Sequence, residues 1–142
     1  PDDRVEFYQS PVRKHTYLSE FAAMTINQLP EVDIVYSYAG ARGHMIHALI
    51  ESDVKGIVVA GTGAGRCSAE EEKALAEAAK KDIKIVMSSR YGSGRVVPLE
   101  KYQYLNVITA DNLPPHKARI LLMVALTKYQ NQADLQEIFH HY

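Results

Sequence analysis

Three glycine-rich stretches are the most promising places for chemistry in this sequence, because glycine lets the backbone approach a ligand closely. They span residues 39–43, 61–65 and 88–95. The middle stretch, with glycine at every second position, resembles a dinucleotide-binding fingerprint, but its third glycine comes one residue too early for G-x-G-x-x-G. The next predicted strand ends in two serines and offers no acidic side chain to hold a ribose. We therefore interpret this stretch as a tight strand-to-helix turn.

The candidate nucleophiles lack partners that would activate them. Ser88, Ser89 and Ser93 lie in the third glycine-rich stretch, but no G-x-S-x-G motif surrounds them and these loops contain no histidine. Cys67 precedes a predicted helix whose dipole could lower the thiol pKa, yet no histidine is assigned to it. We interpret the serines as loop-forming hydroxyls and the cysteine as a packing residue.

The remaining titratable candidates form two pairs. His44 and His47 lie three positions apart on one predicted helix, but two imidazoles make at most half a metal site, so no metal is expected. Glu100 and Asp111 could act as an acid and base pair. Asp111 stands beside the expected start of a helix, where capping would explain it. Glu100 has no visible structural role, so it is the more interesting of the two, with a solvated loop carboxylate as the alternative interpretation.

The hydrophobic pattern predicts an α/β domain that carries these loops at one edge of a sheet. One predicted strand is apolar throughout, as expected when helices cover both faces of a parallel sheet. In such a sheet ligands bind beyond the carboxyl ends of the strands, where the glycine-rich stretches should lie. The predicted strands are residues 32–38, 56–60, 83–88 and 107–109, and the predicted helices are 43–52, 68–81, 114–128 and a last one with Leu135, Ile138, Phe139 and Tyr142 on one face.

Helix-start signals fix two boundaries in this pattern. Ser68 followed three residues later by Glu71 predicts a capping box. Asn112 is expected to cap the next helix, whose first turn accommodates two prolines. That helix, residues 114–128, is apolar nearly all round, which predicts a deeply buried position or a subunit interface.

Length and composition fit one globular domain with a lead-in segment. The chain has 142 residues, with 16 basic and 17 acidic side chains and a formal net charge of -1. This balance gives no field that would attract nucleic acid or anionic lipid, and no apolar run approaches the roughly 20 residues that cross a bilayer. We expect residues 1–31 to be a lead-in or linker, in which Val5–Tyr8 could pair at a sheet edge, and residues 32–142 to form the α/β domain.

Several motifs resemble the C-terminal domain of type II bacterial L-asparaginases. Residues 56–65 are similar to that family's G-I-V-x-x-G-x-G-x-G, and residues 86–96 to its V-x-x-S-S-R-x-G-x-G-x-V. Residues 111–122 resemble its D-N-L-x-P-x-K-A-R-x-L-L. Arg13–Thr16 and Ile138–Tyr142 are also similar to family segments, so the resemblance covers almost the whole chain in order.

The resemblance implies a place in an enzyme that hydrolyses L-asparagine, and often L-glutamine, to the acid and ammonia. The family's threonines lie in T-G-G-T and H-G-T-D of a larger N-terminal domain, and neither motif occurs here, so we expect no catalytic residue and no activity in this chain alone. The resemblance further implies a small Rossmann- or flavodoxin-like sheet, no cofactor, and a homotetramer built as a dimer of dimers. It favours a periplasmic or secreted protein, with a cytoplasmic one as the alternative.

The resemblance also places two residues of this chain against the substrate of a neighbouring subunit. Gly40 matches a position after the first strand where the family often has Asn or Asp, and a glycine offers only backbone groups there. Glu100 is the nearest match to a family glutamate in the loop after the third strand. Either residue could tune the preference for asparagine over glutamine.

Three functions stay open at this point. The chain could be the C-terminal part of a full asparaginase, or a stand-alone binding or regulatory module of the same fold. It could also belong to an amidotransferase acting on charged tRNA, but the balanced charge and the lack of a basic patch count against that.

Overall fold

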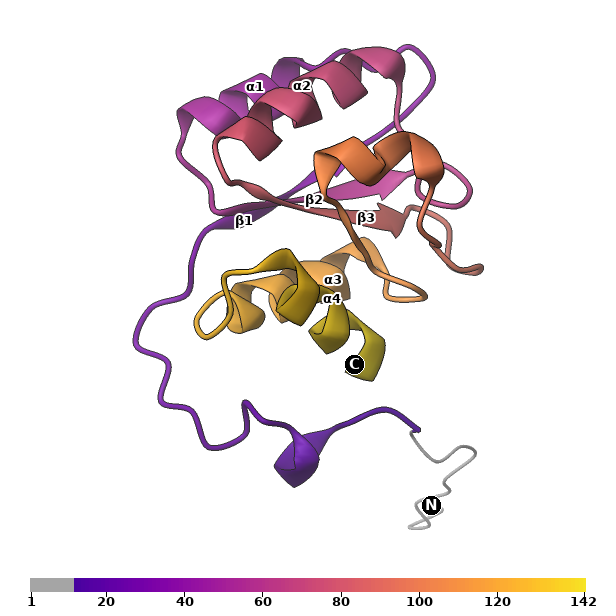
Figure 1. Cartoon of the computed structure of the whole chain (residues 1–142). Coiled ribbons are helices and arrows are strands. Elements are labelled where there is room, and N and C mark those ends of the chain that lie inside the picture. Colours follow the sequence, from indigo (N-terminus) through magenta and orange to yellow (C-terminus); the bar gives the residue numbers. More distant parts are fainter. Residues whose placement is uncertain (1–11) are drawn as a thin grey trace, which may run out of the picture.

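A computed structural model describes residues 12–142 and shows a parallel sheet between two layers of helices (Figure 1). Helices α1 and α2 lie on one face of the sheet, and α3 and α4 on the other (Figure 1). The strands are β1 (Val32–Tyr36), β2 (Gly56–Gly61), β3 (Lys84–Ser89) and β4 (Ile108–Thr109). The helices are α1 (His44–Glu51), α2 (Ala69–Lys80), α3 (Pro115–Ala125) and α4 (Gln132–His141), with two short 3-10 helices, η1 (Thr16–Leu18) and η2 (Glu100–Leu105).

The central strand β2 shows why the sheet needs helices on both faces. All of its residues are buried, and successive side chains point to opposite faces. Ile57 and Val59 pack into the core under α1 and α2, whereas Val58 packs against α3 and α4. The predicted fold class, an α/β sheet of four parallel strands with helices on both faces, is confirmed.

The strand order gives this sheet no crevice of its own. The strands lie in the order β1-β2-β3-β4, so neighbours in the sequence are neighbours in the sheet. In many doubly wound sheets a reversal of strand order opens the ligand crevice. Without such a reversal in the described residues, the loops beyond the strands decide what surface the carboxyl edge presents.

The start of α2 follows the sequence signal closely. Ser68 Oγ accepts the N–H of Glu71 at 3.1 Å, and Glu71 Oε2 accepts the N–H of Ser68 at 2.9 Å. The predicted capping box is therefore confirmed. Glutamates fill the first turn, where the positive end of the helix dipole stabilises them.

The start of α3 corrects one prediction. Its N-cap is Pro114, without a side-chain cap, so Asn112 does not cap this helix. Asp111 takes a left-handed backbone conformation, with φ of 53°, and Leu113 N–H closes a turn onto Ala110 O, which leaves Asn112 two residues too early. Local spacing could not show this turn, because it depends on how the end of β4 meets the helix.

The extent and burial of α3 also differ from the prediction. The helix ends at Ala125, three residues before the expected end at Lys128. It buries one face, including Ala118 and Leu122, against the sheet, but Ile120 on another face is 51% exposed. The helix is therefore a covering helix with an apolar outer flank.

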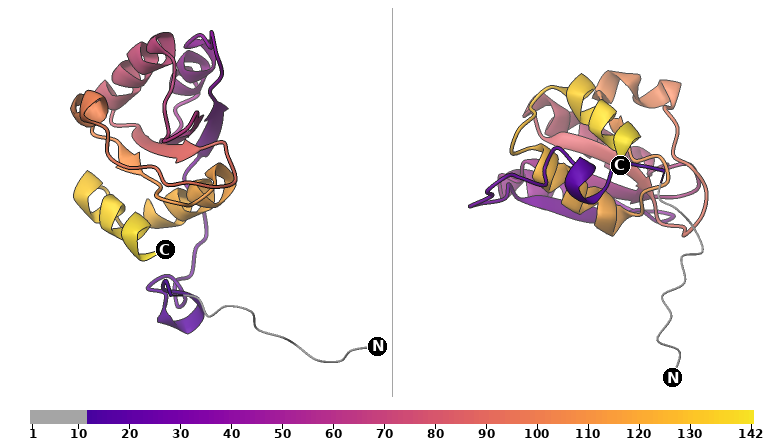
Figure 2. Two further views of the ribbon diagram at one scale, coloured as in Figure 1. Left: turned by 90° about the vertical axis from the view of Figure 1, so that its right-hand side faces the viewer. Right: turned by 90° about the horizontal axis from the view of Figure 1, so that it is seen from below.

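Residues 12–31 run past the ends of α3 and α4 before reaching β1 (Figure 2). Ser19 Oγ lies 2.6 Å from the hydroxyl of Tyr142, and the ring of Phe21 packs 5.7 Å from the Tyr142 ring, measured between centroids. The lead-in segment is thus fastened to the last residue of the chain. The strand predicted at Val5–Tyr8 lies outside the described residues.

Candidate functional site

The 61–65 loop at the carboxyl edge of the sheet is a closed turn. Thr62 and Arg66 pair as an antiparallel bridge, with backbone N···O distances of 2.7 and 2.8 Å. A Cβ on Gly61 would come within 2.6 Å of the Gly65 carbonyl carbon, and one on Gly65 would meet Val96 at 2.7 Å. Gly61 is packed against backbone and Gly65 against the Val96 side chain, which agrees with the interpretation of a tight turn.

The loop after β1 is tied down on both sides of Gly40. Ser37 Oγ donates to Glu71 Oε2 at 2.6 Å, and Ser68 Oγ donates to Ala41 O at 2.6 Å. Gly40 itself is exposed, with φ of +79°, and a Cβ built there would meet nothing within 4 Å. The loop therefore presents a backbone turn to solvent from a fixed base.

The serines after β3 have structural roles. Ser88 Oγ donates to Leu113 O at 2.7 Å, which fastens β3 to the start of α3. Ser89 Oγ accepts the N–H of Tyr91 at 3.2 Å. These two contacts agree with the interpretation of loop-forming hydroxyls, and no histidine bonds either serine within the described residues.

Glu100 begins the 3-10 helix η2, an element that the sequence pattern did not predict. The helix η2 is anchored by Tyr102, whose buried hydroxyl accepts the N–H of Cys67 at 3.0 Å. It is also held by Tyr104, whose hydroxyl donates to Glu72 at 2.9 Å. Glu100 is exposed, and its carboxylate makes no hydrogen bond or ion pair to residues 12–142 in the structure. A fixed helix thus presents a free carboxylate.

The structure ties the two predicted substrate-binding residues to one helix end. The loop of Gly40 bonds Ser68 and Glu71, and the helix of Glu100 bonds Glu72. All three anchors lie in the N-cap and first turn of α2. This shared anchor could not be found from the sequence, because it depends on the loop after β1 and the helix η2 both meeting the start of α2.

Asp111 does not belong to this arrangement, and the capping role expected for it is wrong. Its two carboxylate oxygens pair with Arg95 and with Arg13 of the lead-in segment. These arginines, Arg95 foremost, hold the pKa of Asp111 below its usual range. A carboxylate held ionised by two cations is a poor proton donor at neutral pH, and both of its oxygens are already occupied by arginine side chains.

The other titratable candidates show no sign of activation. Burial raises the pKa of the Cys67 thiol, opposite to the lowering that a helix N-terminus could give. Its sulfur lies 3.4 Å from the Tyr102 hydroxyl, so it packs and bonds rather than acting as a thiolate. His47 Nδ1 lies 3.5 Å from Glu77, and residues 12–142 contain no cluster that could hold a metal ion.

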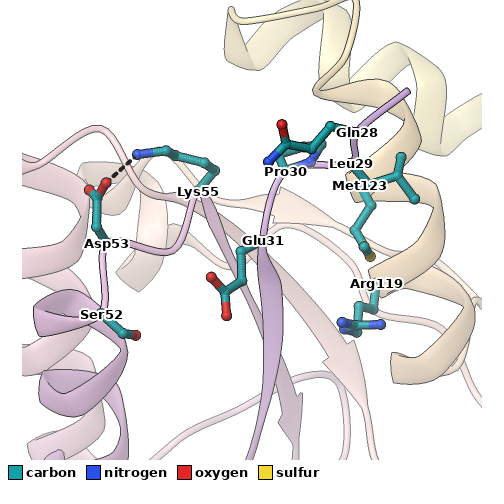
Figure 3. Close-up of a pocket in the computed structure, with 9 residues that line it drawn as sticks. All are labelled: Gln28, Leu29, Pro30, Glu31, Ser52, Asp53, Lys55, Arg119 and Met123. Atoms are coloured by element: carbon teal, nitrogen blue, oxygen red, sulfur yellow. Dashed lines mark hydrogen bonds and ion pairs between the residues drawn. The ribbon is translucent and has the colours of Figure 1, made fainter. Parts of the chain in front are cut away.

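A polar pocket lies at the opposite edge of the sheet (Figure 3). It opens where β1 and β2 begin, and within it Lys55 Nζ pairs with Asp53 at 2.7 Å (Figure 3). Ligands of parallel α/β sheets bind at the carboxyl edge, so this pocket lies away from the predicted site. The lining residues are Gln28, Leu29, Pro30, Glu31, Ser52, Asp53, Lys55, Arg119 and Met123.

Comparison with known proteins shows which family of domains this chain matches. The glutaminase/asparaginase C-terminal domain matches residues 31–139. The chain belongs to this family. A protein from Campylobacter jejuni described as a probable cytoplasmic L-asparaginase has a crystal structure similar to this domain, with a TM-score of 0.93 and 41% identity, covering 100% of this chain and 46% of that one.

Two curated relatives extend the likeness of this asparaginase C-terminal domain. L-asparaginase 2 of Bacillus subtilis (strain 168) is 37% identical over 140 residues, which cover 99% of this chain and 37% of that protein. A probable periplasmic L-asparaginase of Haemophilus influenzae is 33% identical over 144 residues, covering 99% of this chain and 41% of that protein. The chain therefore spans less than half the length of these relatives, whose names include both a periplasmic and a cytoplasmic enzyme. No helix in residues 12–142 is long and apolar enough to cross a membrane.

Proposed function

We propose that this domain works as the C-terminal part of an amidohydrolase that converts L-asparagine and water to L-aspartate and ammonia, with L-glutamine as a second substrate. The observation that carries the proposal is the likeness of the whole chain to an L-asparaginase structure, at 41% identity and a TM-score of 0.93. The family match over residues 31–139 supports it. The lead-in of residues 1–31 is proposed to connect to a catalytic N-terminal domain.

The proposed division of labour leaves the nucleophile outside this domain. The T-G-G-T and H-G-T-D motifs that the resemblance assigns to the catalytic threonines are absent from the sequence. We therefore expect the pure 142-residue chain to release no ammonia from L-asparagine. Turnover above about 1 per second, an ordinary enzyme rate, would contradict both the missing nucleophile and the proposal.

Glu100 is the residue of this domain that we propose to contact a neighbouring subunit's substrate by its side chain. Its carboxylate is exposed, carries no partner within residues 12–142, and stands on a helix fixed to α2. An ionised carboxylate can accept charge-assisted hydrogen bonds from the substrate's α-ammonium, which are roughly twice as strong as neutral ones. Glu100→Gln would keep the shape and remove the charge.

The Glu100→Gln test requires the full-length protein, with Glu51→Gln as the matched control. Glu51 is also exposed but ends α1, away from the carboxyl edge. We expect Glu100→Gln to lower kcat/KM for asparagine by the equivalent of about 1.5–3 kcal/mol, the range for hydrogen bonds to charged groups. Glu51→Gln should leave kcat/KM unchanged. If Glu100→Gln leaves kcat/KM within about twofold on both substrates, Glu100 is a solvated loop carboxylate.

Gly40 is proposed to contribute its backbone to the same site. Asparagine tolerates the left-handed conformation better than most residues, and a Cβ at Gly40 meets nothing within 4 Å. Gly40→Asn should therefore fold normally and shift the ratio of kcat/KM for asparagine to that for glutamine. An unchanged ratio would remove Gly40 from the proposed site.

The assembly and compartment are further proposals of this function. We propose a homo-oligomer, a dimer of dimers, with the apolar outer flank of α3 near Ile120 and Leu121 available as contact surface. Sedimentation over a range of concentrations should show self-association, and a strictly monomeric species at high concentration would argue against it. We propose an exported protein, which fractionation of cells making the full-length protein would test. The proposed partners are the amide substrates and further copies, with neither nucleic acid nor membrane.

A further inference from the structure

The capping box of α2 makes more hydrogen bonds than a helix start requires. A capping box satisfies two backbone N–H groups, those of the cap and of the third helical residue. Here both side chains also bond the loop after β1. Glu71 Oε2 accepts Ser37 Oγ at 2.6 Å, and Ser68 Oγ donates to Ala41 O at 2.6 Å.

These extra bonds enclose the turn that contains Gly40. Ala41 N–H donates to Tyr38 O at 3.0 Å, and Gly40 takes φ of +79°, as a turn with glycine in its third position requires. One tether therefore lies just before this turn, at Ser37, and the other at its last residue. Because Gly40 has no side chain, only its flanking anchors can fix its position.

Burial shields the hydrogen bond between Glu71 and Ser37 from water. Glu71 and Ser37 are each 1% exposed, so water does not compete freely for this hydrogen bond. Arg90 adds a third fixed point by donating to Ser37 O at 3.0 Å. A charged side chain is seldom buried unless its polar atoms are partnered, and here the partners belong to the loop as well as to the helix.

We propose that Glu71 is a positioning residue, which uses the α2 capping box to hold Ser37 and the turn that follows it, together called the 37–41 turn, in place for the substrate. The inference rests on the proposed function, because it takes Gly40 to face a neighbouring subunit's amide substrate. Glu71 does not touch the substrate itself. It sets the position of backbone groups that do.

Ser37→Ala is the variant that separates positioning from helix capping. It removes the tether from Glu71 to the loop and leaves both bonds of the capping box intact. Ser88→Ala is the matched control, since Ser88 is another buried serine at the carboxyl edge, and its hydroxyl bonds Leu113 O rather than the 37–41 turn. Glu71→Gln keeps an oxygen able to accept both hydrogen bonds, whereas Glu71→Ala removes them.

The first measurement is amide hydrogen exchange in the 142-residue chain. Losing one hydrogen bond should speed exchange at the Ala41 N–H by about three- to tenfold in Ser37→Ala, with no such change in Ser88→Ala. Glu71→Gln should exchange like the wild type. Equal exchange in Ser37→Ala and Ser88→Ala, or Glu71→Gln exchanging as fast as Glu71→Ala, would overturn the tether.

The second measurement is steady-state kinetics of the same variants in the full-length protein. A misplaced backbone contact that binds ground state and transition state alike raises KM and spares kcat, so we expect KM for asparagine to rise by about three- to tenfold in Ser37→Ala. Glu71→Gln should keep the wild-type KM, because its side-chain oxygen can still accept both hydrogen bonds. An unchanged KM beside faster exchange would overturn the substrate role and leave only a structural tether. If the wild-type full-length protein hydrolyses neither amide, the proposed function fails, whereas the exchange result still decides the tether.

Discussion

Tyr102 is the buried anchor of η2, and its hydroxyl offers a quantitative test of how that helix is held. The side chain is 1% exposed, and its hydroxyl accepts the Cys67 N–H at 3.0 Å. Tyr102→Phe removes only the oxygen, so the apolar contacts of the ring persist. The Cys67 N–H then loses the one hydrogen bond that it makes within residues 12–142.

The expected size of the effect follows from burial. Leaving a buried donor without a partner costs about 1–3 kcal/mol, and because Cys67 is only half-buried, where water can partly replace the hydroxyl, we expect about 1–2 kcal/mol. Tyr104→Phe is the matched control on the same helix. Tyr104 is 64% exposed and donates to Glu72 at 2.9 Å, so water replaces its partner and the change should stay within about 0.5 kcal/mol.

Urea unfolding of the wild type and the two variants measures this difference. The midpoint of Tyr102→Phe should fall while the slope of free energy against urea stays constant, because the surface exposed on unfolding does not change. Equal losses in both variants would refute the reasoning, since they would mean that the hydroxyl of Tyr102 is no better shielded from water than that of Tyr104.

Three further predictions concern the neighbouring loops. Asp111 has a depressed pKa in the folded state, so its ion pairs stabilise the fold above the unfolded-state pKa of about 3.9. This stabilisation is lost as the pH falls through the folded-state pKa. In urea unfolding, the stability difference between the wild type and Asp111→Asn should therefore be largest near neutral pH and should disappear below about pH 4. Gly61→Ala should lower the free energy of unfolding by about 1–3 kcal/mol, because its Cβ would lie 2.6 Å from a backbone atom. Gly92→Ala, whose Cβ would meet nothing within 4 Å, should leave the stability nearly unchanged. Equal unfolding midpoints for the two variants would contradict this. Cys67 should react with iodoacetamide at pH 7 more slowly than free cysteine, because burial raises its pKa, and a faster reaction would show an activated thiolate.

Much of the fold could be predicted from local pattern. Strand β2 reads as buried because its run is apolar, and α2 starts where Ser68 and Glu71 predict, since a capping box is local chemistry between residues three apart. The start of α3 could not be read this way. Its first turn depends on the left-handed backbone of Asp111, and two arginines 98 and 16 residues away hold that side chain.

The candidate site, like the fold, was predicted in part from the sequence and in part shown only by the tertiary structure. The residues alone single out Gly40 and Glu100 through a resemblance of motifs, and their part in substrate binding stays a prediction. Only the tertiary structure shows that both are anchored on the first turn of α2, through the buried Glu71 and through Glu72. The physical reason is that a side-chain hydrogen bond across 34 residues leaves no periodicity in the sequence, whereas burial and capping follow from neighbours a few residues apart.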